Sequence, residues 1–201
     1  MPPQKLGKYQ LLEELGRGGY GTVYRAMDTA LEVERAVKVL HPALVADPTF
    51  IERFRREAKF AAQMKHAHIV PVYDLDEDGG RYYLAMEYRS GGSLKDKLEK
   101  EGSLPFERAV EIAGQIADAL DHIHKRELIH RDVKPGNILF DEKGNPALGD
   151  LGFGKALSGA TSASLSASGG LIGTPAYMAP ETWMGEEASS ATDVYSLACV
   201  F

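Results

Sequence analysis

Alternating apolar and polar positions characterise the first ninety residues. In the segment 9–15, Tyr9, Leu11 and Leu15 fall on one face when side chains are counted with the two-residue period of a strand. Further strand-type segments follow at 23–27, 35–40, 70–75 and 82–88, the last two separated by an Asp- and Gly-rich turn at 76–80. The pattern predicts an antiparallel sheet of five strands.

One helix is expected to interrupt this series of strands. Asp47 is a candidate N-cap, Pro48 suits the first helical position, and the apolar spacing continues to about Lys65. One face of this helix carries five residues at intervals of three or four, namely Phe50, Phe54, Glu57, Ala61 and Met64. Glu57 is the single charged member of that face, so its carboxylate is expected to need a cation.

From Ser93, a candidate N-cap, the pattern changes to helices. The segment 106–125 carries one apolar stripe of helical spacing, made of Ile112, Ile116, Leu120 and Ile123. Short strands are expected at 138–140 and 146–148, and another apolar helix near 193–201. The segment 157–173 is rich in Ser, Ala and Gly, and we expect it to be mobile. The boundary between the two parts is expected near 90–92.

Composition limits the classes of function. The 201 residues fit one large domain or two small lobes. The 23 basic and 29 acidic side chains give a net charge of −6, so no nucleic-acid partner is expected. Cys199 is the single cysteine, which excludes an internal disulfide and a cysteine-rich zinc cluster. No signal peptide or membrane-spanning segment is evident. The final apolar helix has no C-cap, so Phe201 is not expected to be a natural domain boundary.

Three features of the first part are candidates for a chemical role, namely a glycine-rich turn, Lys38 and Glu57. The sequence 16–21 matches G-x-G-x-x-G and is followed by a strand, which suits a lid of backbone amides over phosphates. Such a pattern alone also fits a hairpin tip without a ligand. Lys38 interrupts an apolar strand, where it is either an edge residue or one member of an ion pair. We predict that it pairs with Glu57, and the alternative is a carboxylate at the edge of the helix face.

Three later motifs complete the pattern, namely His130-Arg-Asp-Val-Lys-Pro-Gly-Asn137, Asp150-Leu-Gly152 and Ala179-Pro-Glu181. With these motifs, the segment from about Tyr9 to Phe201 resembles the catalytic domain of eukaryotic-like, bacterial-type serine/threonine protein kinases. The resemblance implies an α+β, bilobal fold with an N-lobe at 9–90 and an incomplete, mainly helical C-lobe at 91–201. Residues 1–8 would be an N-terminal tail, and 150–181 the activation segment.

The resemblance also assigns roles in binding ATP. Lys38 would hold the phosphates with Glu57 orienting it, under a glycine-rich lid and beside the adenine pocket. The remaining residues that it implies for nucleotide binding are Leu15, Gly16, Gly18, Gly21, Val23, Ala36, Met86, Glu87 and Arg89. Of these, Met86 would guard the inner pocket, and the backbone of 87–89 would be the hinge that bonds the base.

The catalytic roles follow from the same resemblance. Asp132 would accept the proton of the attacking hydroxyl, and Lys134 would neutralise charge on the transferred phosphoryl group. Asn137 and Asp150 would bind Mg²⁺ through oxygen ligands. Asp150-Leu-Gly152 carries Leu where Phe is commoner, with little effect expected.

The same resemblance extends to regulation. The Asp132-x-Lys134 pattern and Thr174 are similar to those of serine/threonine kinases. Arg131 would contact a phosphate on the activation segment, whose hydroxyls are Ser158, Thr161, Ser162, Ser164, Ser166 and Ser168; a plain flexible linker is the alternative.

Two expectations concern the C-terminal part. Asp193 would brace the backbone of the catalytic loop. Glu181 would lack the arginine partner that it has in the family, because that arginine would follow residue 201.

The function expected from these observations is ATP-dependent phosphorylation of serine and threonine hydroxyls in proteins. Two alternatives stay open: an inactive kinase fragment or pseudokinase that binds nucleotide or protein, and a related small-molecule phosphotransferase, against which the Ala179–Glu181 motif argues. The expected location is the cytoplasm, with a membrane-tethered longer parent left open. The resemblance also allows a homodimer that autophosphorylates in trans.

Overall fold

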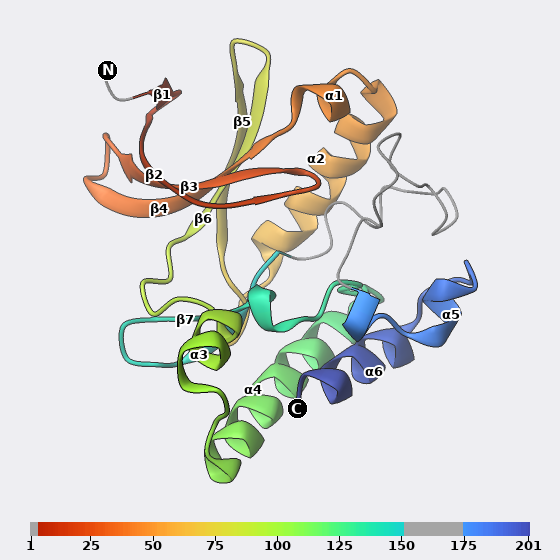
Figure 1. Cartoon of the computed structure of the whole chain (residues 1–201). Helices are drawn as coiled ribbons and strands as arrows, with labels where there is room; N and C mark the ends of the chain where they lie inside the picture. The colour runs from red at the N-terminus through yellow and green to blue at the C-terminus, as the bar shows by residue number, and fades with distance from the viewer. Residues whose placement is uncertain (1–3, 151–174) are drawn as a thin grey trace. The chain divides into compact units, whose positions relative to one another are not determined.

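The computed structural model describes residues 4–150 and 175–201. By its internal contacts the chain divides into two compact units. The first unit contains Met1–Lys65 and Pro71–Tyr88, and the second unit contains His66–Val70 and Arg89–Phe201. The fold is α+β, with strands concentrated in the first unit and helices in the second (Figure 1).

The first unit is built on an antiparallel sheet of strand order β1-β2-β3-β4-β6-β5 (Figure 1). The strands are β1 (Lys5–Leu6), β2 (Tyr9–Gly18), β3 (Gly21–Asp28), β4 (Val33–Leu40), β5 (Val72–Asp78) and β6 (Arg81–Glu87). Its core packs Tyr9 and Tyr83 edge to face among the buried side chains Leu6, Leu11, Ala26, Val37 and Ala85. All five expected strands are present.

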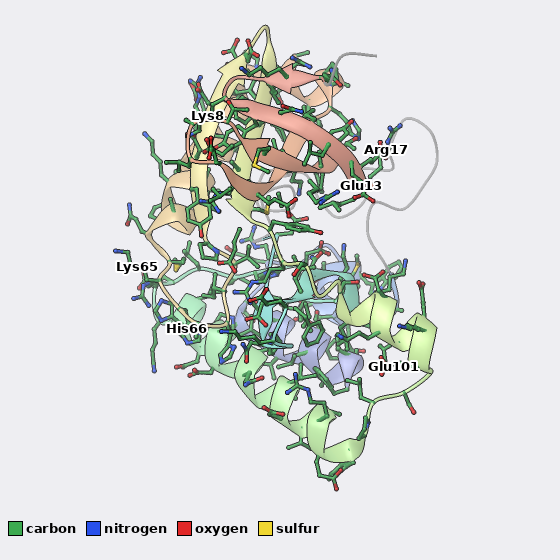
Figure 2. The ribbon with its side chains drawn as sticks, turned by 90° about the vertical axis from the view of Figure 1, so that its left-hand side faces the viewer. Lys8, Glu13, Arg17, Lys65, His66 and Glu101 are labelled. Carbon is green, nitrogen blue, oxygen red and sulfur yellow. The ribbon has the colours of Figure 1, made fainter. Side chains whose placement is uncertain are left out.

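The sheet has a sixth strand, β1, within the residues expected to form a tail, so the five-strand count was wrong. Leu6 is fully buried, and the backbone N–H of Gly7 donates to Asp78 at 2.9 Å. The ammonium group of Lys8 (Figure 2) lies 3.1 Å from Asp74 and 3.6 Å from Asp28. These contacts order the residues before Tyr9, and a two-residue strand is too short to produce a periodic signal.

Two bulges in β2 change which residues face the core. The pairing with β3 shifts between Leu11 and Glu13, and again between Glu14 and Gly16. A bulge adds an unpaired residue, so the simple alternation of faces is broken. Tyr9 and Leu11 are buried as expected, whereas Leu15 is 44% exposed. Leu15 therefore does not join Tyr9 and Leu11 in the core.

Two helices accompany this sheet: α1 (Pro42–Val45) and α2 (Pro48–Gln63), which packs against β5. Asp47 caps α2 as predicted, since its carboxylate accepts a hydrogen bond from the backbone of Thr49 at 2.9 Å. The buried face contains Phe50, Phe54, Ala58, Ala61 and Met64. Glu57 is half-buried beside that face.

The second unit contains α3 (Leu94–Glu101), α4 (Phe106–His124), α5 (Pro180–Trp183), α6 (Ser190–Val200) and the hairpin β7 (Ile138–Phe140)–β8 (Pro146–Leu148). Two short 3-10 turns, η1 (Pro135–Asn137) and η2 (Pro175–Tyr177), complete it. The apolar stripe of α4 is buried as predicted, and α6 packs against α4 (Figure 1). Among the described residues, no helix is long and apolar enough to cross a membrane.

The segment His66–Val70 lies between α2 and β5 in the sequence but belongs to the second unit. Leu148 of β8 donates to the carbonyl of His68 at 2.9 Å and accepts from the backbone of Val70 at 3.0 Å. The ring of His66 (Figure 2) is also hydrogen-bonded to Asp118 of α4 at 3.1 Å. The segment is thus fastened to the strand that leads into Gly149 and Asp150.

Candidate active site

The loop between α4 and β7 gathers the three expected catalytic residues. The Lys134 ammonium lies 2.7 Å from the Asp132 carboxylate. The Asn137 amide nitrogen donates to the backbone carbonyl of Asp132 at 2.7 Å and to its carboxylate at 3.1 Å. One carboxylate therefore receives both a cation and an amide donor, which fixes its orientation within the loop.

A buried carboxylate on α6 holds the backbone of this loop, as predicted. Asp193 is fully buried and accepts hydrogen bonds from the N–H groups of His130 at 2.8 Å and Arg131 at 2.7 Å. His124, at the end of α4, lies 2.8 Å from the same carboxylate through its Nε2 atom. Sequence reasoning missed His124. Its only signal is a basic residue in the last turn of a helix, which identifies no partner.

The ring of His130 connects the loop to the residue before Asp150. Its Nε2 atom lies 3.1 Å from the carbonyl oxygen of Gly149, and its Nδ1 atom accepts from the backbone of Asp132 at 3.3 Å. A carbonyl only accepts, so these two bonds assign the neutral ring with hydrogen on Nε2. Arg131 and Asp150, on either side of this connection, have φ angles of 65° and 55°. Such left-handed conformations are costly for residues with a side chain and cluster at functional sites.

The glycines of the β2–β3 hairpin differ in how much space surrounds them. A Cβ atom at Gly21 would overlap the carbonyl oxygen of Val39 on β4, so packing requires glycine there. A Cβ atom at Gly16 or Gly18 would meet nothing within 4 Å. These two positions therefore keep an uncovered backbone that a ligand can approach closely.

One face of the sheet carries four of the expected nucleotide-binding residues of the first unit. Lys38 of β4 lies directly opposite Val23 of β3, and Ala36 lies directly opposite Met86 of β6. Opposite residues share a face, as do residues two apart along a strand. Lys38 is only 5% exposed. Its pairing with Glu57 stays a prediction.

The residues expected to form the hinge divide between the two units at Tyr88 and Arg89. The backbone N–H of Glu87 donates to the carbonyl of Pro71 at 2.9 Å. The Arg89 side chain is 7% exposed and donates to the carbonyl of Asn145 at 3.3 Å, in the turn between β7 and β8. The guanidinium of Arg89 therefore contacts that turn.

A comparison with known proteins decides the family. The family model for the protein kinase domain matches residues 9–201. The chain belongs to the protein kinase family. It is 40% identical over 194 residues to the serine/threonine-protein kinase PrkC of Bacillus subtilis, covering 96% of this chain and 30% of that relative. It is also 40% identical over 203 residues to PknB of Mycobacterium leprae, with coverages of 99% and 32%.

Solved structures agree with this assignment to the kinase family. The kinase domain of PknI from Mycobacterium tuberculosis superposes with a TM-score of 0.77 at 31% identity, covering all of this chain and 73% of that one. The chain spans only about a third of the length of these two curated relatives: 30% of PrkC and 32% of PknB.

The donor set of this kinase domain fits Mg²⁺, the ion that the family implies. Both hydrogens of the Asn137 amide point to Asp132, and among the described residues its Oδ1 atom accepts no hydrogen bond. Asp150 adds a carboxylate after β8. No group of three His, Cys, Asp or Glu side chains in the described residues is arranged to hold a metal. Mg²⁺ is commonly bound by one or two protein oxygens, with waters and substrate phosphates filling the other positions.

Glu181 of the Ala-Pro-Glu motif is hydrogen-bonded to a residue of α6. Its carboxylate accepts a hydrogen bond from the Thr192 hydroxyl at 2.7 Å, and this bond lowers the pKa of Glu181. The Thr192 hydroxyl in turn accepts from the backbone of Ser189 at 3.0 Å. The expectation concerned the arginine alone, and it stays a prediction; the Thr192 hydroxyl on α6 is a partner that the sequence did not indicate. The expected phosphorylation sites between Ser158 and Thr174 lie outside the described residues.

Proposed function

We propose that this kinase domain transfers the γ-phosphoryl group of Mg²⁺-ATP to serine and threonine hydroxyls of proteins. The observation that carries the proposal is the cluster of Asp132, Lys134 and Asn137 on a loop braced by Asp193. Phosphoryl transfer depends more on positioning and charge neutralisation than on covalent chemistry. A rigid loop that presents a carboxylate, a cation and an amide oxygen suits those requirements.

Each residue of the loop has a distinct role in this proposal. Asp132 orients the attacking hydroxyl and accepts its proton. Lys134, already 2.7 Å from that carboxylate, neutralises charge on the phosphoryl group during transfer. Asn137 and Asp150 hold Mg²⁺, which supplies positive charge to the phosphates when bound. His130 holds Asp150 near Asp132, because its ring is hydrogen-bonded to the Gly149 carbonyl and to the backbone of Asp132.

The first unit would supply most of the residues that bind the nucleotide. Gly16 and Gly18 offer uncovered backbone for the phosphates, and Lys38 offers a nearly buried ammonium. Val23, Ala36 and Met86 share the face of Lys38 and would contact the adenine ring, with the backbone of 87–89 bonding its edge. Leu15, which is largely exposed at the start of the glycine turn, would cover the base.

Phosphate transfer by the chain itself tests this function. The chain is incubated with Mg²⁺-ATP and a basic protein substrate, and added phosphate is followed by intact mass. Asp132→Asn should lower the rate by about 10²–10⁴-fold, because it removes the proton acceptor. Lys38→Met should lose about 10²-fold or more, and Glu57→Gln less, because Glu57 only orients Lys38.

Control measurements separate function from folding. Circular dichroism and thermal unfolding should be the same for the parent chain and for Asp132→Asn, which is isosteric. Equal rates for the parent and Asp132→Asn would refute the assigned role. Nucleotide binding without any transfer in the parent would instead support the inactive, nucleotide-binding alternative, against which the intact loop network argues.

The wider roles of the protein are also part of the proposal. Arg131 would contact a phosphate on the activation segment, and a homodimer would phosphorylate that segment in trans. A rate of autophosphorylation that rises with protein concentration supports transfer in trans, and a concentration-independent rate contradicts it.

A cytoplasmic location, where ATP and protein substrates are present, fits this activity.

A further inference from the structure

A histidine outside the family motifs holds the tip of the glycine-rich hairpin. His41 follows β4, and its Nε2 atom lies 2.8 Å from the carbonyl oxygen of Gly18. Its backbone N–H donates to the carbonyl of Tyr20 at 3.1 Å. The hairpin turns through Gly19 and Tyr20, because Gly18 pairs with Gly21. One residue therefore binds two carbonyl groups of the same tip, within the same unit.

The backbone of His41 is fixed independently of this contact. Its φ and ψ angles of −66° and 136° lie in the region that a following proline, here Pro42, enforces. Its carbonyl accepts from the backbone of Leu44 at 3.0 Å at the start of α1. His41 is the N-cap residue of α1, yet its side chain makes no capping bond there. The ring instead contacts the Gly18 carbonyl, while the backbone of His41 is held in place by Pro42 and α1.

The hydrogen bond acts where the hairpin has least restraint of its own. Gly21 is confined by the backbone of β4, whereas Gly18 has open space around it. A glycine in open space has wide conformational freedom. A planar trans peptide directs its N–H opposite to its C=O, so holding the Gly18 carbonyl also sets the direction of the Gly19 N–H. That N–H is one of the backbone donors that the tip can offer to a phosphate.

We propose that His41 is a positioning residue for nucleotide binding, which orders the glycine-rich tip before the phosphates arrive. The inference rests on the proposed function, since it assigns His41 to the nucleotide site of the kinase. A preordered loop loses less conformational entropy on binding, so the benefit falls on affinity. His41 touches no reacting atom in this arrangement, and the phosphoryl-transfer step itself should be insensitive to it.

Two substitutions at this position test the proposal. His41→Leu keeps a side chain of similar size without a donor, and His41→Gln supplies an amide donor of similar reach. His41→Leu should raise KM for ATP about three- to tenfold with kcat unchanged, the range expected for one hydrogen bond. It should also speed hydrogen exchange of the amides in 16–22. His41→Gln should restore both properties at least in part.

The outcomes are distinguishable from failure of the proposed function. Hydrogen exchange and the dissociation constant of Mg²⁺-ATP need no catalysis, so both are measured even where the parent chain transfers no phosphate. Unchanged exchange and unchanged nucleotide affinity in His41→Leu would overturn the role of His41. A loss of melting temperature with equal effects on kcat and KM, not rescued by His41→Gln, would show a structural role and also overturn it.

Discussion

A single carboxylate determines the geometry of the candidate catalytic loop. Asp193 receives two backbone N–H groups and the His124 ring while fully buried. One of those N–H groups belongs to Arg131, whose φ of 65° costs about 1–2 kcal/mol for a residue with a side chain. The bond from Arg131 to Asp193 offsets this strain. The unusual backbone at Arg131 is therefore maintained by a residue 62 positions later.

Replacing this carboxylate by an amide should loosen the loop. In Asp193→Asn one oxygen becomes an NH₂ group that faces a backbone donor, so a buried N–H of the loop loses its acceptor. We expect a loss of about 1–3 kcal/mol in the free energy of unfolding, the cost of an unsatisfied buried donor. Urea unfolding followed by circular dichroism measures it.

An exposed aspartate of α4 provides the matched control. Asp121 pairs with Lys125 on the helix surface, at 2.6 Å, and Asp121→Asn should change stability by less than about 0.5 kcal/mol. Equal stability of Asp193→Asn and Asp121→Asn would show that the brace contributes nothing.

At the scale of elements, the sequence predicts those features that depend on neighbouring residues alone, such as helix caps and apolar stripes. The N-caps Asp47 and Ser93 could be predicted because a helix start is marked by its first residues. The buried stripe of α4 could be predicted from the spacing of its apolar residues. β1 and the exposure of Leu15 could not be predicted, since the first is two residues long and the second depends on bulges. The partners of Arg89 and Glu181 depend on contacts across the fold, which spacing does not encode.

The cap of α3 gives a test at this scale. Ser93 accepts from the backbone of Asp96 at 3.2 Å, and the Asp96 carboxylate accepts in return from the Ser93 backbone at 2.8 Å. Ser93→Ala removes the hydroxyl and should lower the free energy of unfolding by about 1 kcal/mol. Ser103→Ala changes an exposed serine after the helix and should have no measurable effect. Identical urea midpoints for both variants would contradict the capping role.

At the scale of the whole molecule, several carboxylates favour the folded state only when ionised. The Ser93 hydroxyl and N–H lower the pKa of Asp96, and Asn145 with neighbouring backbone N–H groups lowers that of Asp141. Burial raises the pKa of Asp28, but the N–H groups of Ala30 and Leu31 and the Lys8 ammonium outweigh it, and the net shift is downward. These carboxylates belong to both units.

Burial acts in the opposite sense on a histidine of the second unit. It lowers the pKa of His122, as do the charges of Arg126 and His66, while Asp118 and Asp121 act against the shift. The folded state therefore binds a proton at His122 less readily than the unfolded chain does. The contribution of His122 to the free energy of unfolding is therefore complete when the pH is above 6.5, the ordinary pKa of histidine. It is lost as the pH falls below that value.

Stability should thus decline in two steps as the pH falls. The first step lies just below pH 6.5 and comes from His122. The second lies below about pH 4, where the aspartates, with an ordinary pKa of 3.8, take up protons more readily when unfolded. Urea midpoints measured from pH 7.5 to pH 3 resolve the two steps. His122→Asn should remove the first step and leave the second, because the lowered carboxylates have partners that this substitution does not touch. A first step that persists in His122→Asn would assign it to another group, and a midpoint that stays constant from pH 4 to pH 3 would contradict the stabilising role of the ionised aspartates.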